Sequence, residues 1–188
     1  MTELLGAALK DKLMDWKATM KETLKVINEL VKDGVIVTYA IGGAVAAIYY
    51  LEPFDTADLD VFVQVSSPGS GFVILTPIDE YLIERGYKAK GEFIYVEGMP
   101  VQFLPVFNPL TEEAVRRAQP IKYARVTTRI MRPEHLVAIM LNTGRPKDYL
   151  RINMFLEQGA INMRALNAVL KRHGLMKKWK DNEYRFKP

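Results

Sequence analysis

The feature that most constrains the fold is a stretch of seventeen residues without a charged side chain, Val35–Leu51. It is shorter than the ~20 residues that a helix needs to cross a bilayer, and Gly42-Gly43 interrupts it near its middle. Val35–Tyr39 is rich in β-branched residues, which favours a strand, whereas Ala44–Leu51 is small and apolar, which suits a helix packed closely on a sheet. The stretch therefore predicts a strand, a glycine turn and a buried helix.

Helical and strand patterns alternate through the first two thirds of the chain. Apolar residues recur every three or four positions in Asp11–Lys32, which predicts an amphipathic helix. The apolar run Leu59–Val65 predicts a strand buried on both faces. We also expect helices at 77–85 and 110–118, and strands at 92–97, 100–106 and 121–131.

Beyond Arg132 the patterns are helical only, and they predict helices at 133–142, 147–158 and 162–173. A mixed segment followed by helices indicates an α/β (α+β) fold, a mixed sheet with helices and then a helical C-terminal part. We expect residues 1–131 to form the core and residues 132–188 a helical subdomain, packed together as one compact unit.

Two aspartates introduce the strand that follows the glycine turn. Asp58 and Asp60 are two residues apart, so both side chains point to the same face of the strand. Adjacent carboxylates repel each other and resist burial, and a bridging cation removes that cost. Mg²⁺ suits such a pair, because it accepts one or two carboxylates and completes its shell with water and phosphate oxygens. Gly-Gly alone is common as a plain turn, and Asp-x-Asp alone is common at a strand end. The two motifs in succession are a more specific sign of a functional site.

The composition excludes other kinds of site. The chain has no cysteine and only two histidines, His135 and His173. A disulfide framework, a thiolate metal site and a cysteine nucleophile are therefore impossible, and a Ser-His-Asp triad is not expected. A polyvalent ion would be held by oxygen ligands.

The segment from Ile41 to Val63 resembles the signature of the DNA polymerase β-type nucleotidyltransferase superfamily, a glycine turn followed by an Asp-x-Asp strand. It most resembles the small bacterial branch that includes abortive-infection-type nucleotidyltransferase toxins. Pro133–Leu136 and Leu141–Asp148, with the corner Arg145-Pro-Lys147-Asp148, are similar to that branch's helix pair. The resemblance implies a nucleotidyltransferase fold.

The resemblance also implies an activity, the transfer of a nucleoside monophosphate from a nucleoside triphosphate to an acceptor hydroxyl. It implies that Asp58 and Asp60 bind Mg²⁺ or Mn²⁺ and serve the catalytic step. For nucleotide binding it implies Gly42 and Gly43, whose backbone would cradle phosphates, together with Thr56, Arg145 and Lys147. Lys147 would also neutralise charge in the transition state. The acceptor could be a small molecule, a protein or an RNA.

Three positions depart from the pattern of that branch. Gln102 stands where a third carboxylate is expected, Met140 where a lysine is frequent, and Arg151 where an aspartate is frequent. If Gly98-Met99 forms a two-residue hairpin turn, Glu97 becomes a same-face diagonal neighbour of Gln102, about 7–8 Å away. Gln102 or Glu97 is then a further candidate metal ligand. These departures leave open an alternative, a non-catalytic nucleotide-binding regulator or a toxin–antitoxin component.

The positive charge is concentrated at the C-terminus. The chain carries a formal net charge of +4, and seven of its basic residues lie between Lys171 and Lys187. Aromatic residues among these lysines, such as Trp179 and Phe186, could stack on nucleic-acid bases, but we favour a tail docked on the protein. Lys10, Asp11 and Lys12 interrupt any secretory pattern at the N-terminus, so we expect a cytoplasmic protein with no membrane contact.

Overall fold

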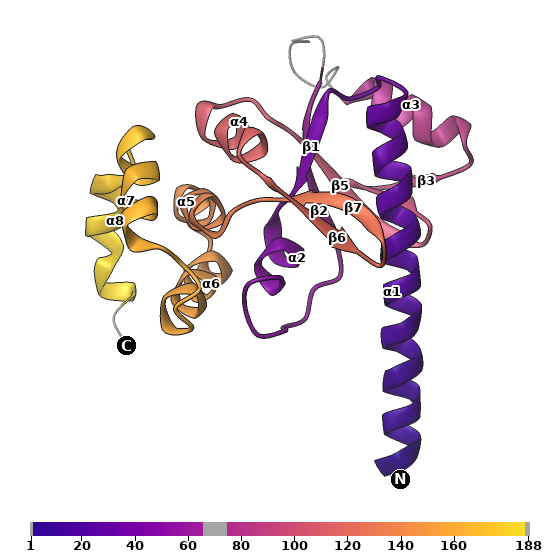
Figure 1. The fold of residues 1–188 in the computed structure, drawn as a ribbon, viewed down its shortest axis with the longest axis horizontal. Helices are drawn as coiled ribbons and strands as arrows, with labels where there is room; N and C mark the ends of the chain where they lie inside the picture. Colours follow the sequence, from indigo (N-terminus) through magenta and orange to yellow (C-terminus); the bar gives the residue numbers. More distant parts are fainter. Residues whose placement is uncertain (1, 66–74, 187–188) are drawn as a thin grey trace.

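The computed structural model describes residues 2–65 and 75–186, and within residues 2–16 only the backbone. The described residues build a seven-stranded mixed sheet in the order β3-β4-β5-β2-β1-β7-β6, with helices on both faces (Figure 1). The strands are β1 (Thr38–Ile41), β2 (Leu59–Gln64), β3 (Lys88–Lys90), β4 (Phe93–Val96), β5 (Met99–Pro105), β6 (Gln119–Tyr123) and β7 (Val126–Ile130). The expected mixed sheet with helices, followed by a helical C-terminal part, is confirmed.

The centre of the sheet brings the glycine turn and the aspartate strand together. β1 pairs with β2 antiparallel, with Ile41 opposite Val61, and β2 pairs with β5 parallel, with Asp60 beside Gln102. In β2 the side chains of Leu59, Val61 and Val63 are buried, and the alternate ones are half-buried. One face of β2 therefore belongs to the core and the other borders the candidate site.

Helices α1 (Thr2–Lys32) and α3 (Thr76–Glu84) cover one face of the sheet (Figure 1). Along α1, Met20, Leu24 and Ile27 are buried as their spacing predicts. The helix begins earlier than the expected Asp11, and its first half extends beyond the rest of the molecule (Figure 1).

The opposite face carries α2 (Gly43–Ile48) and α4 (Pro109–Arg116), and the C-terminal helices pack outside them (Figure 1). These are α5 (Pro133–Thr143), α6 (Pro146–Glu157), α7 (Met163–Arg172) and α8 (Met176–Asn182), followed by the short 3₁₀ helix η2 (Glu183–Arg185). Buried apolar residues from Met20 through Phe186 form one continuous cluster, so the two parts share a core.

Two hairpins differ from the sequence-based expectation. Val96 pairs with Met99, so the turn between β4 and β5 is Glu97-Gly98, one residue earlier than expected. Both turn residues have positive φ, 51° and 85°, which is the type I′ geometry that matches strand twist. The expected strand 121–131 is instead the hairpin β6–β7, which turns at Ala124-Arg125 with positive φ at both residues although neither is glycine.

The C-terminal tail is docked on the helical part, as we favoured. Trp179 and Phe186 are buried, their ring centroids lie 4.8 Å apart, and Phe186 also contacts Tyr149 of α6. Tyr184 remains exposed. The low-complexity loop expected at 66–71 lies outside the described residues. No helix in the described part of the chain is long and apolar enough to cross a membrane.

Candidate active site

Gly42 and Gly43 allow the aspartate strand to approach the turn closely. A Cβ atom at residue 42 would lie 2.5 Å from the ring of Phe62, and one at residue 43 would collide with the carboxylate of Asp60. Gly43 also has a φ of +55°, a conformation that side chains disfavour. The amide of Gly42 donates a 2.9 Å hydrogen bond to the carbonyl of Asp60. The glycine pair therefore fixes the position of the Asp60 side chain.

Asp58 and Asp60 line one cleft of about 460 Å³ between the sheet and the C-terminal helices. Burial raises the pKa of Asp60, and the neighbouring charge of Asp58 raises it further. Arg145, Arg151 and Lys147 oppose both effects through their positive charges. The cleft thus places an acidic pair within electrostatic reach of three cations.

Helix α6 supplies the positive wall of the cleft. Lys147 and Arg151 are four residues apart, so they share one face of the helix, and both line the cleft. Within the described residues, the ammonium of Lys147 makes no ion pair or hydrogen bond. Arg151 lies over the ring of Phe54, 5.3 Å from its centroid. Both cations are available to an anionic ligand.

Arg145 has a different position from Lys147. Its Nε donates to Asp148 Oδ2 at 2.8 Å and its Nη2 to Asp148 Oδ1 at 3.0 Å. Asp148 is fully buried, and it also accepts a hydrogen bond from the Arg145 amide, which caps the start of α6. Because two of its guanidinium nitrogens are hydrogen-bonded to Asp148, the main role of Arg145 is to stabilise the α5–α6 corner from which Lys147 projects.

The remaining predicted site residues fall into two groups. Gln102 lines the cleft beside Asp60. Thr56 donates a 3.3 Å hydrogen bond to Asp58 Oδ1 and so orients that carboxylate. Glu97 is not brought to the site, because the hairpin turn places it away from Gln102, and its carboxylate accepts a 2.7 Å hydrogen bond from Tyr87.

The oxygen atoms at the acidic end suit a divalent cation that shares its shell with a ligand. Among the described residues, no three His, Cys, Asp or Glu side chains gather closely enough to hold a metal ion alone. Asp58 and Asp60 could supply two carboxylates, and the amide oxygen of Gln102 lies on the adjacent strand. Mg²⁺ commonly takes one or two carboxylates and completes its shell from water and substrate phosphates. The residues present fit that mode of binding.

The cleft also contains residues that the sequence patterns did not single out. Glu92 lines it from the β3–β4 turn, and Phe107, 79 % exposed, lies at its edge with Asn108. The place of Arg151 in the cleft could have been predicted from the sequence, because it follows Lys147 by four residues and therefore shares its helix face. Glu92 had no such signal, because its place depends on the short polar strand β3.

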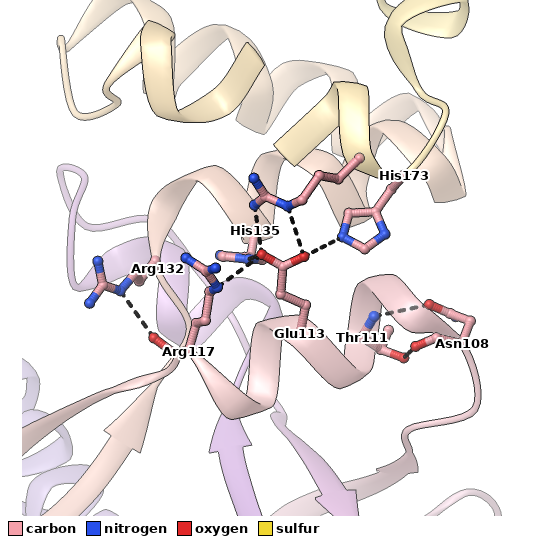
Figure 2. A network of polar contacts seen from close by, with 8 residues as sticks. Asn108, Thr111, Glu113, Arg117, Arg132, His135 and His173 are labelled. Atoms are coloured by element: carbon pink, nitrogen blue, oxygen red, sulfur yellow. Dashed lines mark hydrogen bonds and ion pairs between the residues drawn. The ribbon is translucent and has the colours of Figure 1, made fainter. Parts of the chain in front are cut away.

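A separate polar cluster joins α4 to α5 and α7 beside this cleft (Figure 2). Glu113 is buried, and its Oε2 lies 2.7 Å from His173 Nε2, while its Oε1 contacts Arg172 at 2.6 Å and Arg117 at 3.0 Å. His135 Nε2 lies 3.4 Å from the same Oε1. The hydrogen bonds from Arg172 and the histidines lower the pKa of Glu113 to about 2. Both histidines of the chain thus contact one carboxylate.

No protein-family model matches this sequence, and no curated protein matches it. Among solved structures, the chain is similar to the crystal structure of an antigenic nucleotidyltransferase-like protein from Paracoccidioides brasiliensis. The two share 12% sequence identity, the match covers 88% of this chain and 92% of that chain, and the TM-score is 0.49.

Proposed function

We propose that the protein is a Mg²⁺-dependent nucleotidyltransferase that moves a nucleoside monophosphate from a nucleoside triphosphate to an acceptor hydroxyl. The observation that carries this proposal is the pairing, in one cleft, of Asp58 and Asp60 with Lys147 and Arg151. A triphosphate bound with a divalent cation is anionic and oxygen-rich, and it complements both walls. Mn²⁺ is an alternative cation, because it favours the same oxygen ligands.

Each residue has a proposed task in this reaction. Asp58 and Asp60 hold the cation against the triphosphate, and Thr56 keeps Asp58 oriented. Lys147 neutralises charge on the phosphates, helped by Arg151 and by the outer edge of the Arg145 guanidinium. The missing side chain of Gly43 makes room for the Asp60 carboxylate, and Gly42 supports the turn through its amide hydrogen bond to the Asp60 carbonyl. The backbone of Gly43 is then the part of the turn that contacts the phosphate chain. Catalysis would then come from positioning and electrostatic stabilisation, as is usual for phosphoryl chemistry.

Calorimetric titration tests the binding step. We expect each nucleoside triphosphate to bind measurably only with Mg²⁺ or Mn²⁺, and Asp58→Asn or Asp60→Asn to abolish the metal-dependent binding. Asp55→Asn is the matched control, because Asp55 is exposed and does not line the cleft. Equal binding with and without metal in the wild type, or an equal loss in the Asp55 variant, would contradict the proposal.

Gln102 favours a second candidate, a nucleotide-binding regulator or toxin–antitoxin component that does not catalyse transfer. Its neutral amide lies beside Asp60, where an additional carboxylate would add charge for activating an acceptor. The two candidates differ in an assay with α-labelled nucleoside triphosphates and three acceptor pools: small molecules, cellular RNA and a protein lysate. Transfer by the wild type supports the enzyme. Metal-dependent binding without transfer, with transfer appearing only in Gln102→Asp, supports the regulator.

A further inference from the structure

The reaction proposed above leaves one task without a residue: an acceptor hydroxyl must lose its proton as it attacks phosphorus. Asp58 and Asp60 are assigned to the cation, and Gln102, on the strand beside them, is a poor base because its amide is neutral. Glu97, the other carboxylate considered near this position, is hydrogen-bonded to Tyr87 and does not line the cleft. The following inference therefore rests on the proposed function and concerns its acceptor side.

The β3–β4 hairpin carries a carboxylate to this side of the cleft. Lys90 pairs with Phe93, so Gly91 and Glu92 form the two-residue turn. The β4–β5 pairing ends at Ile94–Val101; continued by one residue it would bring Phe93 level with Gln102, with Glu92 in the turn just beyond. Glu92 is exposed and lines the same cleft as the two aspartates.

Strand spacing places Glu92 at a useful distance from Asp60. β4, β5 and β2 are consecutive in the sheet, so the backbones of β4 and β2 are about 10 Å apart at about 4.8 Å per strand. That separation explains why Glu92 does not join the aspartates as a shared metal ligand. It leaves space for a hydroxyl group of an acceptor between Glu92 and the α-phosphate at the aspartates.

Glu92 is also the remaining anionic group of the cleft. Four carboxylates line the cleft: Asp58, Asp60, Glu92 and Asp148. Asp148 is buried and neutralised by Arg145, and the aspartate pair is assigned to the cation. Within the described part of the chain, Glu92 forms no ion pair, so its carboxylate is free to accept a proton.

We infer that Glu92 is the general base that activates the acceptor hydroxyl. The acceptor oxygen forms a bond to the α-phosphorus while its proton passes to the Glu92 carboxylate. The bond from the α-phosphorus to the bridging oxygen breaks, and its electron pair leaves with pyrophosphate. Glu92 then releases the proton to solvent. The acceptor accordingly enters along the β3–β4 side of the cleft, opposite the cationic wall of α6.

Two matched variants test this role. Glu92→Gln removes the charge and keeps the size, and Glu97→Gln does the same at the turn of the neighbouring hairpin, outside the cleft. We expect Glu92→Gln to lower the rate of labelled-nucleotide transfer by about 100-fold or more, the range attributed to general bases. Its calorimetric affinity for the metal–nucleotide complex should stay within about twofold of the wild type, since tenfold would need about 1.4 kcal/mol of lost contacts. Glu97→Gln should match the wild type in both measurements.

The pH profile adds a measurement that a purely structural role would not change. Glu92→Gln should change the shape of the low-pH part of the rate profile, whereas a substitution that acts only on structure should lower the rate by the same factor at every pH. Wild-type transfer that survives Glu92→Gln at every pH would overturn the inference and leave the proposed function standing. Metal-dependent binding with no transfer to any acceptor pool would overturn the inference and support the regulator. Absence of metal-dependent nucleotide binding would overturn the proposed function itself.

Discussion

At the scale of single residues, Gly43 has the tightest constraint in the candidate site. Its left-handed backbone disfavours any side chain, and a Cβ atom would collide with the Asp60 carboxylate. Gly34 has a similar φ of +74°, but no atom lies within 4 Å of the position that a Cβ atom would take there, so it experiences the conformational cost alone. Comparing substitutions at Gly34 and Gly43 therefore distinguishes the cost of backbone strain from the cost of steric crowding.

We expect Gly34→Ala to lower the free energy of unfolding by about 1 kcal/mol, the usual cost of a side chain in this conformation. Gly43→Ala should cost about 1–3 kcal/mol more, because overpacking forces Asp60 or β2 to shift. It should also weaken metal-dependent nucleotide binding, whereas Gly34→Ala should not. Denaturant unfolding and calorimetry measure the two effects. Equal loss of stability in both variants would contradict the role of crowding.

The residues that sequence patterns identified are those whose positions depend on local chain geometry. Asp58 and Asp60 share a face because they are two apart on a strand, and Gly43 adjoins Asp60 because one antiparallel pairing connects them. Glu92 and Glu113 depend on distant pairing and packing instead. Glu113 meets His173 from sixty residues away, and no periodicity in the sequence encodes that contact.

At the scale of elements, the position of the β4–β5 turn keeps Glu97 out of the cleft. The sequence indicates a hairpin with Gly98 at the first turn position, but Gly98 occupies the second, and Glu97 adopts a positive φ before it. That shift makes Glu97 a turn residue beyond the Val96–Met99 pair, and so moves it along the hairpin away from Gln102. Short polar strand β3, Lys88–Lys90, has no apolar alternation, so the hairpin that carries Glu92 could not be predicted from hydrophobic pattern.

Two cations at the start of α6 have different roles: Arg145 stabilises the fold, whereas Lys147 is proposed to bind the nucleotide. Arg145→Ala leaves the buried carboxylate of Asp148 without its two guanidinium hydrogen bonds, and we expect a loss of about 2 kcal/mol in the free energy of unfolding. Lys147→Ala should change stability by less than about 0.5 kcal/mol, since its ammonium has no partner among the described residues. The lysine variant should nevertheless bind nucleoside triphosphate more weakly.

Chemical denaturation and nucleotide titration of both variants check this division. A large loss of stability in Lys147→Ala would show that the lysine belongs to the structure of the corner. Unchanged stability in Arg145→Ala would show that the backbone amide alone satisfies Asp148.

At the scale of the whole molecule, Glu113 connects the sheet-bearing core to the C-terminal helices. It projects from α4, and its partners are Arg117 at the end of α4, His135 on α5 and His173 at the end of α7 (Figure 2). Arg172, the last residue of α7, is the fourth partner. The same two parts form the walls of the cleft, with Thr111 of α4 and Leu136 of α5 among the lining residues. The cluster therefore helps to set the distance between the walls.

This cluster predicts how stability depends on pH. The pKa of Glu113 is about 2 in the folded protein, below its value of about 4.5 in the unfolded chain, so its contribution is complete above pH 4.5 and disappears as pH falls toward 2. Burial lowers the pKa of His135, so protonation of this histidine also favours the unfolded chain, beginning below about pH 6.5. Low pH therefore destabilises the folded protein through both groups. Solvent reaches Arg172 and Arg117, which limits the contribution of Glu113 to at most about 3 kcal/mol.

Glu113→Gln tests the sign and the size of this effect. The variant keeps the shape but removes the charge, and we expect it to unfold about 2–3 kcal/mol more easily than the wild type at pH 7, the range for hydrogen bonds to a charged group. The difference should shrink as the pH falls from about 4.5 toward 2, because residue Glu113 then binds a proton in the unfolded chain while it stays ionised in the folded protein. Glu112→Gln, exposed on the same helix, is the control and should show no such convergence. A stability difference that stays constant down to pH 3 would mean that packing of residue 113, and not its charge, holds the C-terminal helices against the core.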